Sequence, residues 1–116
     1  MKTARLTSRW QERPPVASKK LRNAARGQTC TVMLYPYCNQ DAETVVLAHA
    51  PSDYKGMGVK SPDWWGADAC SVCHDIIDGR RQVKDITKDQ IFNCHIRGVY
   101  RTLARRIEGG LINVPT

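Results

Sequence analysis

Aromatic residues are scarce in this sequence: phenylalanine occurs once in 116 residues, and Phe, Trp and Tyr together make up 7%. Long apolar runs are also lacking, and no stretch approaches the roughly 20 apolar residues of a transmembrane helix. Residues Met1 to Arg5 lead into no apolar segment, so we expect no secretory signal peptide. These absences argue against a membrane protein and predict a small cytoplasmic domain whose core needs support from a metal or from disulfides.

Cysteine is the residue type whose number and spacing carry most information. Five cysteines cannot all form disulfides, and in the cytoplasm cysteine pairs more often bind metal. Cys70 and Cys73 have the spacing at which one turn directs two sulfurs at a tetrahedral ion, and Cys30 and Cys38 form a second, wider pair. We therefore predict a structural Zn²⁺ on these four cysteines and place Cys94 in the core. The alternative is that Cys30, like Cys94, is a small buried apolar residue.

The segment Cys70-Ser-Val-Cys73-His74 also fits two other patterns. It has the form of a c-type haem attachment motif, but such haem is attached outside the cytoplasm and would leave Cys30 and Cys38 without a role. A thioredoxin-like redox pair at a helix N-terminus is the second alternative. That motif needs a βαβ setting, which the predicted order of elements does not provide. Zinc is the interpretation that uses all four cysteines.

Positive charge is concentrated near the N-terminus. Residues 1–27 contain eight Lys and Arg residues and one acidic residue, Glu12, while the net charge of the whole chain is +7. Residues 1–18 are predicted to be a flexible basic arm and residues 19–116 a single domain. A basic arm on a neutral domain is typical of a protein that binds a polyanion such as DNA. The alternative is a solvated tail without a partner.

The pattern of apolar and turn residues predicts an α+β fold. We expect a short basic helix over residues 18–27, strands over 29–34 and 43–50, a long loop over 51–66 and a helix over 70–78. Thr87 with Gln90 forms a capping box that begins the last and longest helix, and Gly109-Gly110 end it. Apolar residues at helical spacing predict its buried face: Phe92, Ile96, Val99, Leu103 and Ile107.

Histidines occur in three of these elements. His49 ends the strand predicted at 43–50, where a neutral imidazole can take a proton from water near pH 7. His74 lies near the start of the helix predicted at 70–78, and Asp78 lies one turn later on the same helical face. His95, on the last helix, either faces the same cleft or is a boundary residue without a role. For any single histidine, a hydrogen bond to neighbouring backbone is the alternative explanation.

The sequence resembles the YbcO-like nuclease family of prophages, small proteins of the HNH-type (ββα-metal) endonuclease class. The resemblance runs from about Leu21 to Leu111, and the motifs that carry it are Ala24-Ala-Arg-Gly, Val46-Leu-Ala-His49, Ala69-Cys-Ser-Val-Cys-His-Asp-Ile-Ile-Asp78, Cys94-His95 and Gly98-Val-Tyr-Arg-Thr102. It implies a small zinc-stapled, HNH-like core with an additional long C-terminal helix and the basic arm. It also implies metal-dependent hydrolysis of DNA in phage recombination or DNA processing.

By position, the resemblance implies His49 as the general base, Asp63 as the residue that orients it, and His74 with Asp78 as ligands of a catalytic Mg²⁺ or Mn²⁺. His95 and Asp75 are candidates for a third ligand, because Ala48 stands where many HNH enzymes carry a metal-binding side chain. The basic residues expected to hold the DNA backbone are Lys19, Lys20, Arg22, Arg26, Arg97, Arg101 and Arg105.

DNA is the implied partner, with a phage or host recombination protein as a further one, in the cytoplasm of a bacterial host. A function of another class is the alternative: a zinc-knuckle module that binds DNA, RNA or a phage protein without catalysis. The residue that favours this alternative is Ala48, which offers no metal ligand.

Overall fold

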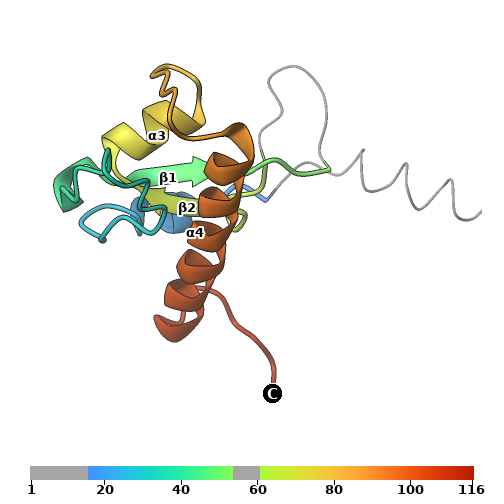
Figure 1. Cartoon of the computed structure of the whole chain (residues 1–116). Coiled ribbons are helices and arrows are strands. Elements are labelled where there is room, and N and C mark those ends of the chain that lie inside the picture. The colour runs from blue at the N-terminus through green and yellow to red at the C-terminus, as the bar shows by residue number, and fades with distance from the viewer. Residues whose placement is uncertain (1–15, 54–60) are drawn as a thin grey trace, which may run out of the picture.

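The computed structural model describes residues 16–53 and 61–116. Most of the predicted arm and the middle of the predicted loop, residues 1–15 and 54–60, lie outside the described residues. The elements in chain order are α2 (Lys19–Asn23), the 3₁₀ turn η1 (Ala42–Thr44), β1 (Val46–His49), β2 (Gly66–Ala69), α3 (Ser71–Ile77) and α4 (Lys88–Glu108). The fold is a small mixed α/β structure in which a two-stranded sheet lies between the short helix α3 and the long helix α4 (Figure 1).

The sheet is an antiparallel pair in which Val46 lies opposite Ala69 and His49 opposite Gly66. β1 confirms the core of the strand predicted at 43–50. The other predicted strand is wrong: residues 29–34 form no strand. The partner of β1 is β2, which begins at Gly66, the last residue of the predicted loop, and continues through residues for which no element was predicted. The sequence Gly-Ala-Asp-Ala has low intrinsic strand propensity. Its small residues form a strand here because they allow neighbouring elements to pack closely against it.

Residues 29–34 run beside β2 without forming a ladder. The Thr31 N–H donates to the Asp68 carbonyl at 2.7 Å, and Met33 has a positive φ of 52°, which interrupts extended backbone. Two guanidinium groups of α4 bind the carbonyls that a neighbouring strand would otherwise bind: Arg101 donates to Thr31 O at 2.8 Å and Arg105 to Thr29 O at 2.7 Å. The segment is therefore held by side chains of α4.

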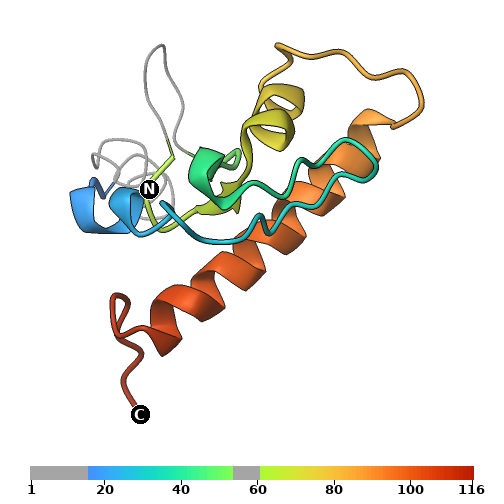
Figure 2. The same ribbon diagram turned by 90° about the vertical axis from the view of Figure 1, so that its left-hand side faces the viewer.

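Helix α4 packs directly on β2 (Figures 1 and 2). A Cβ atom on Gly98 would lie 3.0 Å from both Ala67 Cβ and Thr31 Oγ1, so the approach requires glycine at this point of the helix. The buried residues of α4 are His95, Gly98, Val99, Thr102 and Arg106. The predicted buried face is confirmed at Val99 and in part at Ile96 and Leu103, which are half-buried and pack against the core. It is wrong at Phe92 and Ile107, which are exposed. The face that packs is small and polar because it meets Ala67 and the carboxylate of Asp68.

Asp68 is fully buried on β2 and is held by α4. Arg106 forms an ion pair with both carboxylate oxygens, and Arg105 NH1 lies 3.1 Å from Oδ2. The Asp68 N–H donates to Thr102 Oγ1 at 2.9 Å, and Thr31 Oγ1 donates to the Asp68 carbonyl. A buried carboxylate is tolerated only when it is paired and hydrogen-bonded in this way.

Thr102→Val is expected to lower the free energy of unfolding by about 1–3 kcal/mol, because it leaves the Asp68 N–H buried without an acceptor while preserving the side chain's shape. Urea unfolding followed by circular dichroism measures the loss. Thr102→Ser keeps the hydroxyl and is the control. A valine variant as stable as the wild type would show that this hydrogen bond contributes nothing.

The helix ends follow the sequence signals closely. Ser18 caps α2, Thr87 and Gln90 form the predicted capping box of α4, and Gly79 follows α3 with φ of 79°. Helix α2 ends at Asn23, four residues before the predicted stop at Gly27. No helix within residues 16–53 and 61–116 combines the length and the apolar character required to cross a bilayer.

Candidate metal cluster and catalytic cleft

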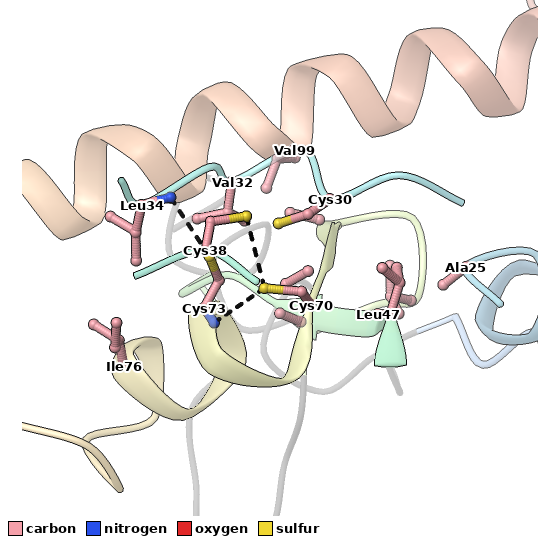
Figure 3. Close-up of a cluster of buried hydrophobic side chains, with 14 of the residues drawn as sticks. Ala25, Cys30, Val32, Leu34, Cys38, Leu47, Cys70, Cys73, Ile76 and Val99 are labelled. Carbon is pink, nitrogen blue, oxygen red and sulfur yellow. Dashed lines mark hydrogen bonds between the residues drawn. The ribbon is translucent and has the colours of Figure 1, made fainter. Parts of the chain in front are cut away.

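Four buried cysteines from separate parts of the chain meet at one point (Figure 3). Cys30 and Cys38 come from the irregular segment before β1, Cys70 caps α3 and Cys73 lies in its first turn. All four sulfurs lie within 4.8 Å of one another, and Cys70 Sγ is 3.8 Å from Cys38 Sγ. Zn–S bonds of ~2.3 Å in a tetrahedron place the sulfurs about 3.8 Å apart. The cluster can therefore hold a metal ion such as zinc.

The electrostatics of the cluster also fit a cation. A hydrogen bond from the Cys73 thiol lowers the pKa of Cys30 to about 4, whereas burial raises the pKa of Cys38 to about 11. The pKa of Cys73 is raised by its hydrogen bond to Cys30 and by burial. Without a cation, one negative charge at Cys30 therefore opposes ionisation of its neighbours. A bound dication reverses that balance, because it stabilises every thiolate.

Backbone N–H groups support the sulfurs of α3. The Leu34 N–H donates to Cys73 Sγ, and the Cys73 N–H donates to Cys70 Sγ, each at 3.4 Å. Such bonds stabilise negative sulfur. Cys94 is not a member of the cluster and packs at the edge of the core, as predicted.

His49, the last residue of β1, is paired with Asp63 from the connection between the strands. His49 Nε2 lies 2.7 Å from Asp63 Oδ1. The other oxygen, Oδ2, accepts hydrogen bonds from the Ser18 N–H and from Arg22 NH1, both at 2.6 Å. Asp63, which the resemblance implied as the residue that orients His49, is thus in direct contact with it, and Ser18 and Arg22 of the α2 region fix Asp63 in turn.

Asp63 is ionised in this arrangement. Burial alone raises the pKa of Asp63, but hydrogen bonds from the Ser18 backbone, from His49 and from Arg22 outweigh burial and leave its pKa below the usual range. The anionic Asp63 accepts a hydrogen bond from the Nε2–H group of His49. The lone pair of His49 is then on Nδ1, which is the nitrogen free to accept a proton.

His74 and Asp78 lie one turn apart on α3 and converge. His74 Nε2 is 3.1 Å from Asp78 Oδ2. Arg80, in the turn after the helix, contacts the same oxygen at 2.9 Å and also pairs with Asp75 at 2.9 Å. These contacts, the hydrogen bond to Asp75 first among them, raise the pKa of Arg80. Asp75 therefore pairs with Arg80 and does not join His74 and Asp78.

An open cleft of about 640 Å³ brings the two pairs together. We call it the basic cleft; the chemically active side chains that line it are His49, His74, Asp78, Arg22, Arg26 and Arg80. One wall comes from β1, one from α3 and one from α2. The arrangement places the imidazole of His49, the His74–Asp78 pair and three guanidinium groups around one space.

His95 is buried on α4, and its Nε2 lies 2.9 Å from the Ala48 carbonyl. Burial lowers the pKa of His95, which therefore stays neutral and donates Nε2–H to that carbonyl. This contact fixes the residue immediately before His49. His95 lines a second hollow with His49 and Asp78, but not the basic cleft. Within residues 16–53 and 61–116, the four cysteines form the only close group of three or more metal-binding side chains.

The predicted basic residues fall into separate groups. Arg22 and Arg26 line the basic cleft, and Lys19 and Lys20 are exposed on the same helix, α2. Arg97 lines a different hollow beside Leu34 and Tyr35. Arg101 and Arg105 bind the backbone of residues 29–31, so their first role is structural, and a DNA contact by these two residues stays a prediction.

Sequence reasoning missed three ion-pair partners, two at the basic cleft and one between α4 and β2. Arg22 was expected to bind DNA, but it also forms an ion pair with Asp63. Arg80 was not predicted as a site residue, although it follows its partner Asp78 by two residues. Arg106 was not predicted as the partner of Asp68. Only Arg80 had a local signal, since Asp75, Asp78 and Arg80 lie within about one turn. The other two pairs join residues far apart in the chain.

Comparison with known proteins adds independent information. A family model described as "Putative nuclease YbcO" matches residues 19–110. "Putative nuclease YbcO" of Escherichia coli strain K12 is 40% identical over 93 residues, which cover 79% of this chain and 95% of that protein, and the protein of the same name from Enterobacteria phage 82 matches equally. A solved structure described as a putative bacteriophage protein from Escherichia coli K-12 MG1655 has a TM-score of 0.66 and 35% identity, covering 78% of this chain and 100% of that one.

Proposed function

The chain belongs to the YbcO family, and from that membership and the basic cleft we propose that it is an HNH-type endonuclease that hydrolyses DNA with the help of a divalent ion. The observation that carries the proposal is the position of His49: it is hydrogen-bonded to Asp63 and lines the same cleft as His74 and Asp78. We also propose a role in phage recombination or DNA processing, with a recombination protein as a further partner; the relative from Enterobacteria phage 82 supports the link to phages.

The order of elements supports the HNH assignment. β1 ends at the proposed base, β2 returns antiparallel to it, and α3 follows directly with the proposed ligands His74 and Asp78. This is the ββα order in which a strand histidine and a helix ligand pair face one space. Cys70 and Cys73 fix the start of α3 through the cluster that we assign to structural Zn²⁺, so the metal cluster positions the helix that carries the ligands.

In the proposed mechanism His49 removes a proton from the attacking water. Asp63 keeps the imidazole proton on Nε2 and orients the ring, so Nδ1 receives the proton of the water. Arg22 compensates the charge of Asp63 and keeps that carboxylate ionised. Arg26 and Arg80 line the cleft where the negative phosphodiester would lie, and guanidinium groups suit phosphate oxygens.

The residues His74 and Asp78 fit a divalent ion. One imidazole nitrogen and one carboxylate oxygen converge there, and Mg²⁺ commonly takes only one or two carboxylates from the protein, with water and substrate phosphate as its other ligands. An ion bound at this pair would stabilise the charge that develops on the phosphate and on the leaving 3′ oxygen. Arg80 contacts the same carboxylate and balances part of its charge.

A non-catalytic zinc-stabilised module that binds nucleic acid is the second candidate. Two observations favour it: Asp78 already has a cationic partner in Arg80, and Ala48 supplies no ligand beside His49. The test is incubation of purified protein with supercoiled plasmid and Mg²⁺ or Mn²⁺, with and without a chelator. Nicking that depends on the ion supports the nuclease; DNA binding without nicking under any condition supports the module.

Arg26→Ala is expected to weaken DNA binding and to flatten the slope of log affinity against log salt by about 0.9, the value for one lost phosphate contact. Arg26 is exposed and lines the basic cleft. Arg97→Ala removes the same charge from a hollow on α4 outside that cleft and is the matched control. Fluorescence anisotropy over a salt series measures both. An Arg26→Ala slope equal to that of the wild type would show that the basic cleft is not where DNA lies.

A further inference from the structure

A second hollow adjoins the basic cleft at the proposed catalytic residues. It has a volume of about 730 Å³ and shares His49 and Asp78 with the basic cleft. Its walls are largely apolar, and we call it the apolar cleft; the side chains that define it are Ile76, Ile77, Ile86, Ile91 and Phe92. His49 and Asp78 therefore stand between a space suited to phosphate and a space suited to an uncharged, apolar group.

Phe92 is the aromatic side chain of this apolar cleft. It lies in the first half of α4 and is 48% exposed. This is the chain's single phenylalanine, a residue type that is usually buried in a core. In the described parts of the chain, the only ring-to-ring contact joins Trp64 and Trp65, so the ring of Phe92 has no aromatic partner there. A half-exposed ring at the wall of a cleft offers a surface on which a planar group can stack.

Positive charge flanks the apolar cleft as well. Lys88 and Arg81 are exposed and line it, while Arg22, Arg26 and Arg80 line the basic cleft on the other side of His49. Cations on both sides of His49 match a polyanion that continues in both directions from that point. Aromatic rings combined with a positively charged groove are typical of sites for single-stranded nucleic acid, where each base stacks on a side chain.

We propose that the apolar cleft receives an unpaired nucleobase of the DNA strand whose phosphate lies at His49, with the base stacked on Phe92. The proposal rests on the nuclease function and adds the substrate class: DNA with at least one unpaired nucleotide at the site of cleavage, such as a single strand or a branch point. A fully paired base would have to leave the duplex stack first, which opposes binding.

The test measures binding without cleavage, on the His49→Ala background and without added divalent ion. The probes are a fluorescein-labelled 15-nucleotide single strand and the duplex of the same sequence, compared by anisotropy at one salt concentration. We expect tighter binding of the single strand. Phe92→Leu keeps an apolar side chain but no ring, and should weaken single-strand binding about fivefold or more while changing duplex binding less than twofold. Phe92→Trp should restore single-strand binding.

Tyr100→Leu is the matched control, because Tyr100 lies on the same helix, is 75% exposed and lines neither cleft. It should leave both affinities unchanged. Equal affinity for single strand and duplex in the His49→Ala protein with Phe92 unchanged would overturn the proposal. So would equal effects of Phe92→Leu and Tyr100→Leu. It would also be overturned by elution of the Phe92→Leu variant at a lower apparent mass than the wild type on gel filtration, since this face would then bind a second copy of the chain.

The outcome is separable from that of the nuclease proposal. Ion-dependent plasmid nicking with no effect of Phe92→Leu on single-strand binding leaves the nuclease standing and removes the stacking site. Loss of single-strand affinity in Phe92→Leu, with no ion-dependent cleavage of single-stranded, branched or plasmid DNA by the wild type, leaves the stacking site standing and removes the nuclease.

Discussion

Replacing Cys70 with serine is expected to leave the protein without a stable folded state. Cys70 is fully buried, caps α3 and is one of the four sulfurs that join this helix to the segments containing Cys30 and Cys38. Metal binding contributes on the order of 10 kcal/mol in small zinc domains, as much as the entire stability of a typical domain. Circular dichroism should show loss of the cooperative unfolding transition, and elemental analysis should fall from one zinc per wild-type chain to none.

Cys94→Ser is the control for this prediction, because Cys94 lies outside the cluster and is only half-buried. It should retain the zinc and unfold cooperatively. A Cys70→Ser protein with the wild-type metal content and melting temperature would contradict the assignment of the cluster as a structural metal site.

His49→Ala is expected to lower the rate of DNA cleavage by about 10²- to 10⁴-fold, the contribution of a positioned proton acceptor. The side chain is partly exposed at the end of β1 and is not one of the clustered sulfur ligands, so the fold and the zinc content should not change. Asp63 keeps its hydrogen bonds from Ser18 and Arg22 in this variant. Initial rates of plasmid nicking measure the effect.

His74→Ala separates loss of the base from loss of the ion. It removes one of the two converging ligands on α3 and should raise the concentration of Mg²⁺ or Mn²⁺ needed for half-maximal cleavage, whereas His49→Ala should leave that concentration unchanged. Cleavage by His49→Ala at the wild-type rate, in a preparation free of contaminating nuclease, would show that another group accepts the proton.

The features predicted best from the sequence are those set by local spacing. Cys70 and Cys73 lie in one turn, and His74 and Asp78 lie one turn apart on the same helix. Thr87 and Gln90 lie at the start of another helix. Short-range geometry is enough to bring the members of each pair together. The sequence also predicted that Cys30 and Cys38 lie beside Cys70 and Cys73, because a structural zinc ion usually takes four ligands.

The features missed are those decided by tertiary contacts. β2 has the composition of a loop, yet Gly66 and Ala67 are there because Leu47 and α4 approach too closely for larger residues. Helix α4 buries its polar side, since Thr102 and Arg106 bind the buried Asp68, and periodicity of apolar residues cannot reveal such a match. The pairing of Arg22 with Asp63 likewise joins residues 41 positions apart.

The most direct measurement of the central claim is cleavage of DNA by the wild-type protein in water enriched in ¹⁸O, followed by mass spectrometry of the products. If His49 activates water for attack on phosphorus with departure of the 3′ oxygen, products should form only with Mg²⁺ or Mn²⁺ and carry one ¹⁸O in their 5′-phosphates. The absence of any product from single-stranded, branched or duplex DNA with either ion would contradict the account.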